Sequence, residues 1–328
     1  MNSIVSTSIR ALATALWLVA VGAPAVAQNV PVADFFRLPT YADVRMSPSG
    51  QRLLATAPRP DGRLSLVVLD LNELSKSRTV AGYRDVDIRG AAWVNDDRIV
   101  FQLHDSDQPA STNRGTGLFA VSVAGGEEPR ALIRPQWQDI GESTNIASRA
   151  LPPNHALEAL LRDGSNDVVV AEWVWSNSGE LLSRNLKRVD TVSGIARGIS
   201  QGVPAGTLDW TLDRAGRPRV IEVAKGATEA TYWKPTPESE WVKVSEGDRY
   251  SRRPGFDALH VDAANRLYAS ASVSADVTSL VAIDMAADPD KQQELLATPG
   301  FDFHGQLVLS GSGAVLGARY LTDARATL

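Results

Sequence analysis

The sequence SPSGQRLLA, residues 47–55, places a tight turn directly before an apolar strand, and similar phrases recur along the chain. Gly50 is the turn residue of this first copy. The others are VNDDRIVFQ (94–102), PPNHALEAL (152–160), DRAGRPRVI (213–221), DAANRLYAS (262–270) and SGSGAVLGA (310–318), with turn residues Asp97, Asn154, Gly216, Asn265 and Gly313. All are residue types that tolerate positive φ or bond their own backbone. Successive turns lie 47, 57, 62, 49 and 48 residues apart, and repeats of about 40–50 residues with four strands each are typical of propeller blades.

Short apolar and β-branched runs fill the chain between clusters of Gly, Pro, Asn, Asp and Ser, as hairpins require. We predict strands over 52–58, 64–71, 98–104, 117–123, 156–162, 167–175, 208–213, 217–224, 230–234, 241–245, 266–273, 279–285 and 314–321. Helical periodicity is scarce: residues 34–38 and 288–296 are expected to hold short helical turns at most. The sequence therefore predicts an all-β protein, a β-propeller of about six to seven four-stranded blades. The two long intervals are expected to hold extended loops, and a pair of β-sandwiches is the alternative.

Residues 1–27 have the pattern of a signal peptide. Arg10 supplies a positive charge, residues 11–22 form a short apolar run, and Ala25 and Ala27 give the small-x-small pattern of a cleavage site after Ala27. The apolar run falls short of the ~20 residues of a spanning helix, so an uncleaved anchor is the less favoured alternative. We expect a periplasmic or secreted protein with no membrane contact after cleavage. Because the chain has no cysteine, stability must come from a large core and not from disulfides.

Composition excludes several function classes. A formal net charge of −5 and the lack of any run of Lys and Arg argue against nucleic-acid binding. Of the 328 residues, 44% are hydrophobic, which is typical of a folded, turn-rich globular chain. We expect residues 28–328 to form one propeller domain without a cofactor.

Three segments resemble a known family. DFFRLPTYADVRMSPSGQRLLA (34–55), AAWVNDDRIVF (91–101) and LFAVSVAGGEEPRAL (118–132) are similar to the opening blades of bacterial serine peptidases of the prolyl oligopeptidase family. The resemblance is strong over 34–132 and general beyond. It implies an N-terminal propeller that covers an α/β-hydrolase domain and admits only short or unfolded peptides, as in dipeptidyl and acylaminoacyl peptidases.

The hydrolase domain itself is not expected in this sequence. It would bring alternating strands and helices, a G-x-S-x-G nucleophile elbow, and then an Asp and a His. One formal match exists, GISQG at 198–202 with Ser200, and His260 and His304 follow it. A nucleophile, however, needs a sharp turn from a buried strand into a helix, whereas Pro204 follows Ser200 within a polar context. We interpret Ser200 as a loop residue and predict no catalytic residue, so the chain is expected to be inert alone.

The remaining candidate groups are weaker. The four histidines His104, His155, His260 and His304 include no close-spaced pair, so a zinc site is not supported. A calcium cluster is conceivable at Asp85, Asp87, Asp96, Asp97, Asp105 and Asp107, although turns explain these residues better. Glu127 and Glu128 could bind a peptide amino terminus, but in AGGEEPR solvation is favoured. Seven tryptophans are interpreted as blade packing in preference to a ligand-lining set: Trp93, Trp137, Trp173, Trp175, Trp210, Trp233 and Trp241. Trp173 and Trp175 alternate and so share one sheet face.

Two functions from different classes remain open. The first is the substrate-gating domain of a peptidase, with peptides as partners once a hydrolase domain is joined. The second is a free-standing periplasmic propeller that binds a peptide, protein or glycan, and a propeller hydrolase with its own central site is a minor third. The chain stops at ARYLTDARATL (318–328), inside its sixth repeat. We therefore expect incomplete last blades, and self-association through an open propeller edge.

Overall fold

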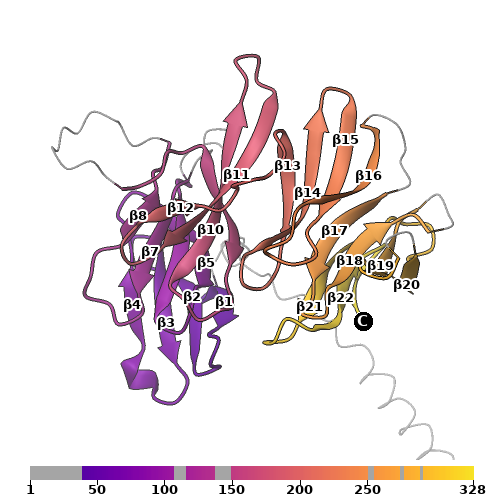
Figure 1. Ribbon diagram of the computed structural model, residues 1–328. Helices are drawn as coiled ribbons and strands as arrows, with labels where there is room; N and C mark the ends of the chain where they lie inside the picture. The colour runs from indigo at the N-terminus through magenta and orange to yellow at the C-terminus, as the bar shows by residue number, and fades with distance from the viewer. Residues whose placement is uncertain (1–38, 107–115, 137–148, 250–254, 274–276, 289–290) are drawn as a thin grey trace, which may run out of the picture. The chain divides into compact units, whose positions relative to one another are not determined.

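The computed structural model describes residues 39–106, 116–136, 149–249, 255–273, 277–288 and 291–328 (Figure 1). In these ranges the chain forms six β-sheets, and the one helical segment there is a 3-10 turn, η1 (Leu74–Lys76). The prediction of an all-β propeller is confirmed, with six blades. We number the sheets blades 1 to 6 in chain order. None of the described helical segments is long and apolar enough to cross a membrane.

Each blade is built from strands that follow one another in the sequence. Blade 1 holds β1 (Ala42–Met46), β2 (Arg52–Pro58), β3 (Leu64–Asp70) and β4 (Arg78–Ala81); blade 2 holds β5 (Asp87–Trp93), β6 (Arg98–His104), β7 (Leu118–Ser122) and β8 (Arg130–Ile133). Blade 3 holds β9 (His155–Leu160), β10 (Asp167–Trp175), β11 (Leu181–Asp190) and β12 (Ala196–Gly198); blade 4 holds β13 (Thr207–Leu212), β14 (Pro218–Lys225), β15 (Thr228–Trp233) and β16 (Val242–Asp248). Blade 5 holds β17 (Phe256–Val261), β18 (Arg266–Ala271), β19 (Ser279–Asp284) and β20 (Gln292–Leu296); blade 6 holds β21 (His304–Leu309), β22 (Val315–Leu321) and β23 (Arg325–Thr327).

Neighbouring strands pair antiparallel throughout, so every blade is a meander of hairpins. The pairing is longest between β10 and β11, where it runs from Asp167 opposite Asp190 to Trp175 opposite Leu181. Figure 1 shows the tip of this hairpin extending beyond the strands beside it. Residues 288–296, where a short helical turn was expected, instead contain β20, which pairs with β19. That expectation was wrong because tertiary pairing overrides the helix propensity of a Gln- and Leu-rich segment.

Five of the six aligned turns occupy equivalent positions, between the first and second strands of blades 1, 2, 4, 5 and 6. Positive φ values occur at four of them: Gly50 (74°), Gly216 (74°), Asn265 (63°) and Gly313 (85°). The third turn was misplaced. Asn154 lies before β9, and the equivalent turn of blade 3 contains Gly164, with φ of 77°. Every strand of a hairpin follows a turn, so a turn-strand phrase does not reveal which strand of the blade it begins.

The core consists of apolar layers between successive blades. Phe101 of blade 2 is fully buried, stacks on Phe119 at 5.7 Å, and belongs to a cluster with Leu54 and Leu66 of blade 1. Further clusters join blades 2 and 3, 3 and 4, 4 and 5, and 5 and 6. Because a four-stranded sheet has two faces, a blade buries both only by packing between neighbours.

Hydrogen bonds from side chains fix the junctions between blades. The indole Nε1 of Trp93 donates to the Arg45 carbonyl oxygen of blade 1 at 3.0 Å, and that of Trp210 donates to the Arg184 carbonyl oxygen of blade 3 at 2.9 Å. Arg98, in turn, donates to the Thr191 carbonyl oxygen of blade 3 at 2.6 Å. Such directional contacts set the angle between sheets, which apolar packing alone leaves undetermined.

Replacing Trp93 tests how much a junction contributes to stability. Trp93→Phe keeps an aromatic ring but removes the hydrogen bond, and should lower the free energy of unfolding by about 1 kcal/mol. Trp93→Ala removes a side chain that is only 3% exposed and leaves a cavity. This substitution should lower the free energy of unfolding by about 3–5 kcal/mol. Urea denaturation followed by circular dichroism measures both. Trp175→Phe, at a 53% exposed position, is the control and should change stability by less than about 0.5 kcal/mol; equal losses at Trp93 and Trp175 would contradict the assignment.

Candidate functional site

A cavity lies where the first strands of the six blades end, and we call it the channel. Its volume is about 830 Å³, within the range of about 300–1,000 Å³ of known ligand pockets. Every blade contributes to its wall: Met46 from blade 1, Val94 from blade 2, Leu160 from blade 3, Leu212 from blade 4, His260 from blade 5 and Leu307 from blade 6. All six blades line this cavity, which makes it the candidate site.

The channel wall is apolar along the strands and polar at the turns that end them. Leu160, Leu212, Leu307 and Leu309 belong to the strand section. The turn section carries Ser47, Asn95, Asp96, Arg162, Asp213, Arg214 and Ser310. The channel therefore offers aliphatic surface along the strands, and hydrogen-bonding and charged groups at the turns.

A second hollow of about 480 Å³ adjoins the turn section on blades 3 to 6. Arg162, Asp213, Arg214, His260 and Gly313 line both cavities. We call this hollow the channel mouth. It was not found from the sequence, because its residues come from turns of four different blades.

Arginines dominate the charge of the channel mouth. Its wall carries Arg162, Arg214, Arg217 and Arg219 against three aspartates, Asp163, Asp213 and Asp262. Arg217 pairs with Asp213 at 2.8 Å, and Asp163 pairs with Arg188 of the same blade at 2.8 Å. The sequence offered one indication of this basic hollow, namely the arginines that stand next to turn residues in RDG (162–164) and DRAGRPR (213–219).

His260 connects blades 5 and 6 at the edge of the channel. Its Nε2 lies 3.0 Å from the Gly313 carbonyl oxygen, and its ring lies 6.2 Å from that of Tyr268. The side chain is buried. Because its Nε2 is hydrogen-bonded to the Gly313 carbonyl oxygen, His260 holds the turn of blade 6 in position.

Ser200 lies just after β12, the last strand of blade 3. The Leu186 amide donates to its Oγ at 2.5 Å, and the hydroxyl donates to the Leu186 carbonyl oxygen at 3.4 Å. No helix follows it. His260 and His304, the candidate bases, lie in blades 5 and 6. The structure therefore does not bring the formal elbow together with either histidine, and both bonding directions of the hydroxyl are used by backbone.

The other two histidines also lie apart. His155 is buried in β9, where its Nδ1 is 3.1 Å from the Pro152 carbonyl oxygen and its Nε2 is 2.8 Å from Lys187 Nζ. Burial, and then the charge of Lys187, lower the pKa of His155, whose neutral ring accepts from the ammonium group. Lys187 also pairs with Glu172 at 3.0 Å. His104 ends β6 in blade 2.

Two of the acidic residues considered for calcium, Asp87 and Asp96, bond to other parts of the fold. Asp87 is buried, accepts from the Leu64 amide at 2.8 Å and pairs with Arg63 at 3.7 Å, and its other contact is Ser106. Asp96 accepts from the amide and hydroxyl of Ser49, which lowers its pKa against the opposing effect of burial. Asp107 lies outside the described residues. Across the described ranges, no group of three or more potential ligands is placed to hold a metal ion.

Glu127 and Glu128 are exposed on the hairpin between β7 and β8, away from the channel wall. Glu127 pairs with Arg98 and accepts from the Ser122 amide at 2.8 Å. Since Arg98 also holds the Thr191 carbonyl oxygen, Glu127 supports the junction between blades 2 and 3. The structure gives these residues no position from which to meet a peptide in the channel.

The tryptophans divide into a buried and an exposed group. Trp93, Trp210 and Trp233 are buried between blades, as predicted for core positions. Trp173 and Trp175 share a face, with ring centroids 6.1 Å apart and an interplanar angle of 11°, but Trp175 is 53% exposed. The core interpretation was wrong for Trp175, because the hairpin of β10 and β11 extends past its neighbour. Trp137 lies outside the described residues.

Comparison with known proteins gives structural neighbours only. No protein-family model matches the chain, and no curated protein matches it. One similar structure is the β-propeller domain of the Trilobed protease from Pyrococcus furiosus, described as having an open velcro topology, with 12% identity and a TM-score of 0.50 over 88% of this chain and 78% of that one. The chain has the fold of a peptidase propeller domain. A prolyl endopeptidase, one of two in which inter-domain dynamics were related to catalysis and specificity, matches with 11% identity and a TM-score of 0.56. The match covers 88% of this chain and 40% of the endopeptidase, so the propeller corresponds to less than half of that protein.

Ser200 can be tested directly as a nucleophile. A fluorophosphonate probe should label the purified chain no more than it labels Ser200→Ala, because both bonding directions of the hydroxyl are occupied by Leu186. The same substitution should lower stability by about 1 kcal/mol, since the Leu186 amide loses its acceptor. Ser178→Ala, in an exposed turn, serves as the control. Stoichiometric labelling that disappears in Ser200→Ala would show that the serine is reactive.

Proposed function

We propose that this chain is the substrate-gating propeller of a secreted or periplasmic serine peptidase of the prolyl oligopeptidase type, without catalytic activity of its own. The observation that carries the proposal is a channel lined by all six blades in a fold similar to peptidase propellers. Dipeptidyl and acylaminoacyl peptidases are the activities that the sequence resemblance favours. Peptides are the proposed partners.

Size exclusion is the physical basis of the gating role. A folded domain of 100 residues has a radius of gyration of about 13 Å, whereas the channel holds about 830 Å³ in total. An extended peptide advances only about 3.3–3.6 Å per residue and presents one residue at a time. The channel therefore favours short or unfolded chains over folded proteins.

Two further parts of the proposal rest on other observations. The apolar run and small-residue pattern of residues 1–27 support export. The position of Ser200, whose hydroxyl is bonded to Leu186 within blade 3, supports the absence of catalysis. A hydrolase domain would have to supply nucleophile, acid and base.

Thiol accessibility tests the gating role, because the chain has no cysteine and each introduced thiol is unique. Leu212→Cys places a thiol at a half-buried position on the channel wall, and Leu74→Cys places one at a 72% exposed position in η1. A thiopyridyl-activated neutral tetrapeptide should react with both. An activated folded domain should react at least about tenfold more slowly with Leu212→Cys than with Leu74→Cys, because its dimensions exceed the channel.

Equal rates at the two positions with the folded domain would overturn the gating role.

The alternative is a free-standing propeller that binds a peptide, protein or glycan. Saturable binding of one such ligand, without discrimination by size, would favour it.

We also propose that the chain associates with a second copy through an open edge of the propeller, formed by the exposed apolar faces of blades 1 and 6. Val44 and Met46 of β1 are 52% and 63% exposed. In blade 6, Leu316, Leu321 and Leu328 are 67%, 44% and 68% exposed. Exposed apolar patches on a sheet face are sites for association with another chain.

Light scattering after size-exclusion chromatography tests this association. The apparent mass of the wild type should rise with concentration, and Leu316→Lys should reduce that rise because association would bury an unpaired charge. Leu74→Lys, at an exposed site in blade 1, should leave it unchanged. A monomer at every concentration would contradict self-association.

A further inference from the structure

We propose that the channel mouth binds a peptide carboxylate through Arg162, Arg214 and Arg219. The inference rests on the proposed gating function and adds to it a preference for one chemical group. The carboxylate has two sources, the C-terminus of a peptide or an acidic side chain. Both are planar anions that match the donor fork of a guanidinium group.

Arg219 is the central observation. It lies in β14, is only 4% exposed, and lines the channel mouth. Its Nε donates to the Lys234 carbonyl oxygen at 2.9 Å, and its Nη2 donates to the Pro235 carbonyl oxygen at 2.7 Å and to Asn265 Oδ1 at 2.8 Å. All three acceptors are neutral. Among the residues that the structure describes, no carboxylate lies within ion-pair distance of this guanidinium group.

The charge of Arg219 is therefore buried without a counter-charge. Trp233, 3% exposed, lies under the guanidinium group at 4.8 Å and contributes only a cation–π contact. Burial lowers the pKa of Arg219, against the attraction of Asp213 and with the repulsion of Arg217. Buried charges are normally paired. An anion in the adjoining hollow would provide the missing counter-charge.

Arg214 and Arg162 extend the positive charge toward the channel. The Nε and Nη2 of Arg214 both donate to the Arg162 carbonyl oxygen, at 3.2 and 3.1 Å. This arrangement satisfies donors but leaves the charge of Arg214 uncompensated. In the described part of the chain the guanidinium group of Arg162 also has no carboxylate partner. Both residues are exposed and line both cavities.

The aspartates of the mouth are already engaged. Asp213 is paired with Arg217, and Asp163 with Arg188. Asp262 accepts from the Ala264 and Arg266 amides of its own turn, each at 2.9 Å. Asp213 and Asp163 are thus paired with other arginines, and Asp262 alone offsets part of the positive charge of Arg162, Arg214 and Arg219.

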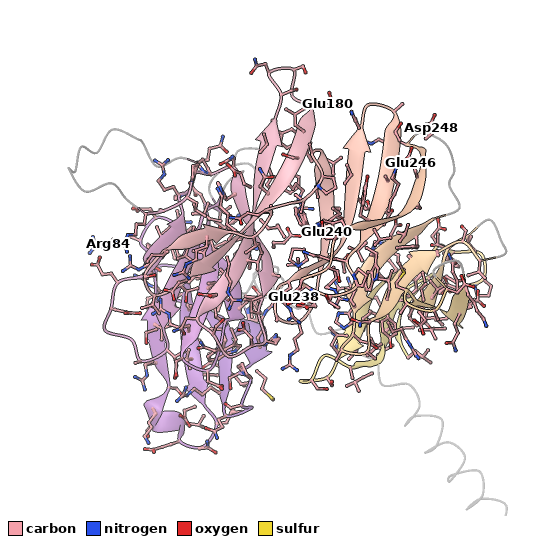
Figure 2. The ribbon with its side chains drawn as sticks, in the orientation of Figure 1. Arg84, Glu180, Glu238, Glu240, Glu246 and Asp248 are labelled. Atoms are coloured by element: carbon pink, nitrogen blue, oxygen red, sulfur yellow. The ribbon has the colours of Figure 1, made fainter. Side chains whose placement is uncertain are left out.

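The geometry also links the mouth to the channel. Arg162 and Arg214 stand where the two cavities meet, so an anionic end held there belongs to a chain that can extend into the strand section. Glu238 and Glu240 follow on the loop after β15 (Figure 2). Both carboxylates are exposed, so solvent and salt screen their repulsion of an anion bound in the mouth.

Isothermal titration with three peptides tests the proposal on the full chain. Acetyl-tetra-alanine free acid should bind at least about tenfold more tightly than its C-terminal amide, because the amide lacks the anion that forms charge-assisted hydrogen bonds. An amidated peptide with one glutamate distinguishes the side-chain source from the C-terminal source. Binding of the acid should weaken with added salt.

Two variants and a control assign the effect to the mouth. Arg162→Ala/Arg214→Ala changes only exposed side chains and should reduce the affinity for the acid at least about tenfold, close to that of the amide. Arg219→Lys retains the charge but loses the fork, and should weaken binding if it folds. Arg84→Ala removes an exposed arginine elsewhere on the surface (Figure 2) and should leave affinity unchanged.

Several results would overturn the carboxylate site. Equal affinity for acid and amide, no binding of the acid, or an equal loss in Arg84→Ala would each do so. The gating experiment uses a neutral tetrapeptide. Size discrimination can therefore persist when carboxylate preference is absent, and the two proposals can fail separately.

Discussion

Burial of sheet faces between successive blades is the constraint on which this structure depends. A four-stranded meander has two apolar faces and no helix to cover either, so the sheets must cover one another. The buried residues divide accordingly into layers between blades, of which the layer around Leu54 and Phe101 joins blades 1 and 2. Radial stacking then brings the first strand of every blade to the centre, and the channel is the space that six such strands leave between them. The candidate site is thus a direct product of how the core is built.

Polar contacts at the blade junctions place that site more finely. Trp93 and Trp210 bond backbone carbonyl groups of the preceding blades, and His260 bonds the Gly313 carbonyl oxygen of the following one. The bonds of Trp93 and His260 reach an inner strand or its turn, so they fix where the channel wall stands. Arg98 acts farther out, holding blade 3 through Thr191 while Glu127 balances its charge. The same residue type has a different role in Arg219, whose buried charge faces a hollow and has only neutral acceptors.

Much of the fold was readable from the sequence. Central strands such as β2, β6 and β10 were predicted at their observed bounds, because buried strands carry dense apolar and β-branched runs. Strands with many polar residues were missed, including β11 with its sequence LLSRNLKRVD and the short β4 and β12. The site was hardly predictable. Its residues, Arg162, Arg214 and Arg219 among them, come from separate turns and strands whose meeting depends on the ring and not on local pattern. The GISQG segment around Ser200 matches the sequence pattern of a nucleophile elbow, but no helix follows the serine and the candidate histidines lie in other blades.

The layered core also has a consequence for cooperativity. Each layer involves only two blades, so stability resembles a chain of nearest-neighbour couplings and not one indivisible unit. The layers are unequal: fourteen buried residues join blades 1 and 2, but only Leu280, Phe303 and Ala318 form the buried cluster between blades 5 and 6. We therefore expect local opening to have its lowest free energy at blade 6. Since β21 and the Gly313 turn of that blade line the channel and its mouth, detachment of this one blade would widen the passage without unfolding the other five.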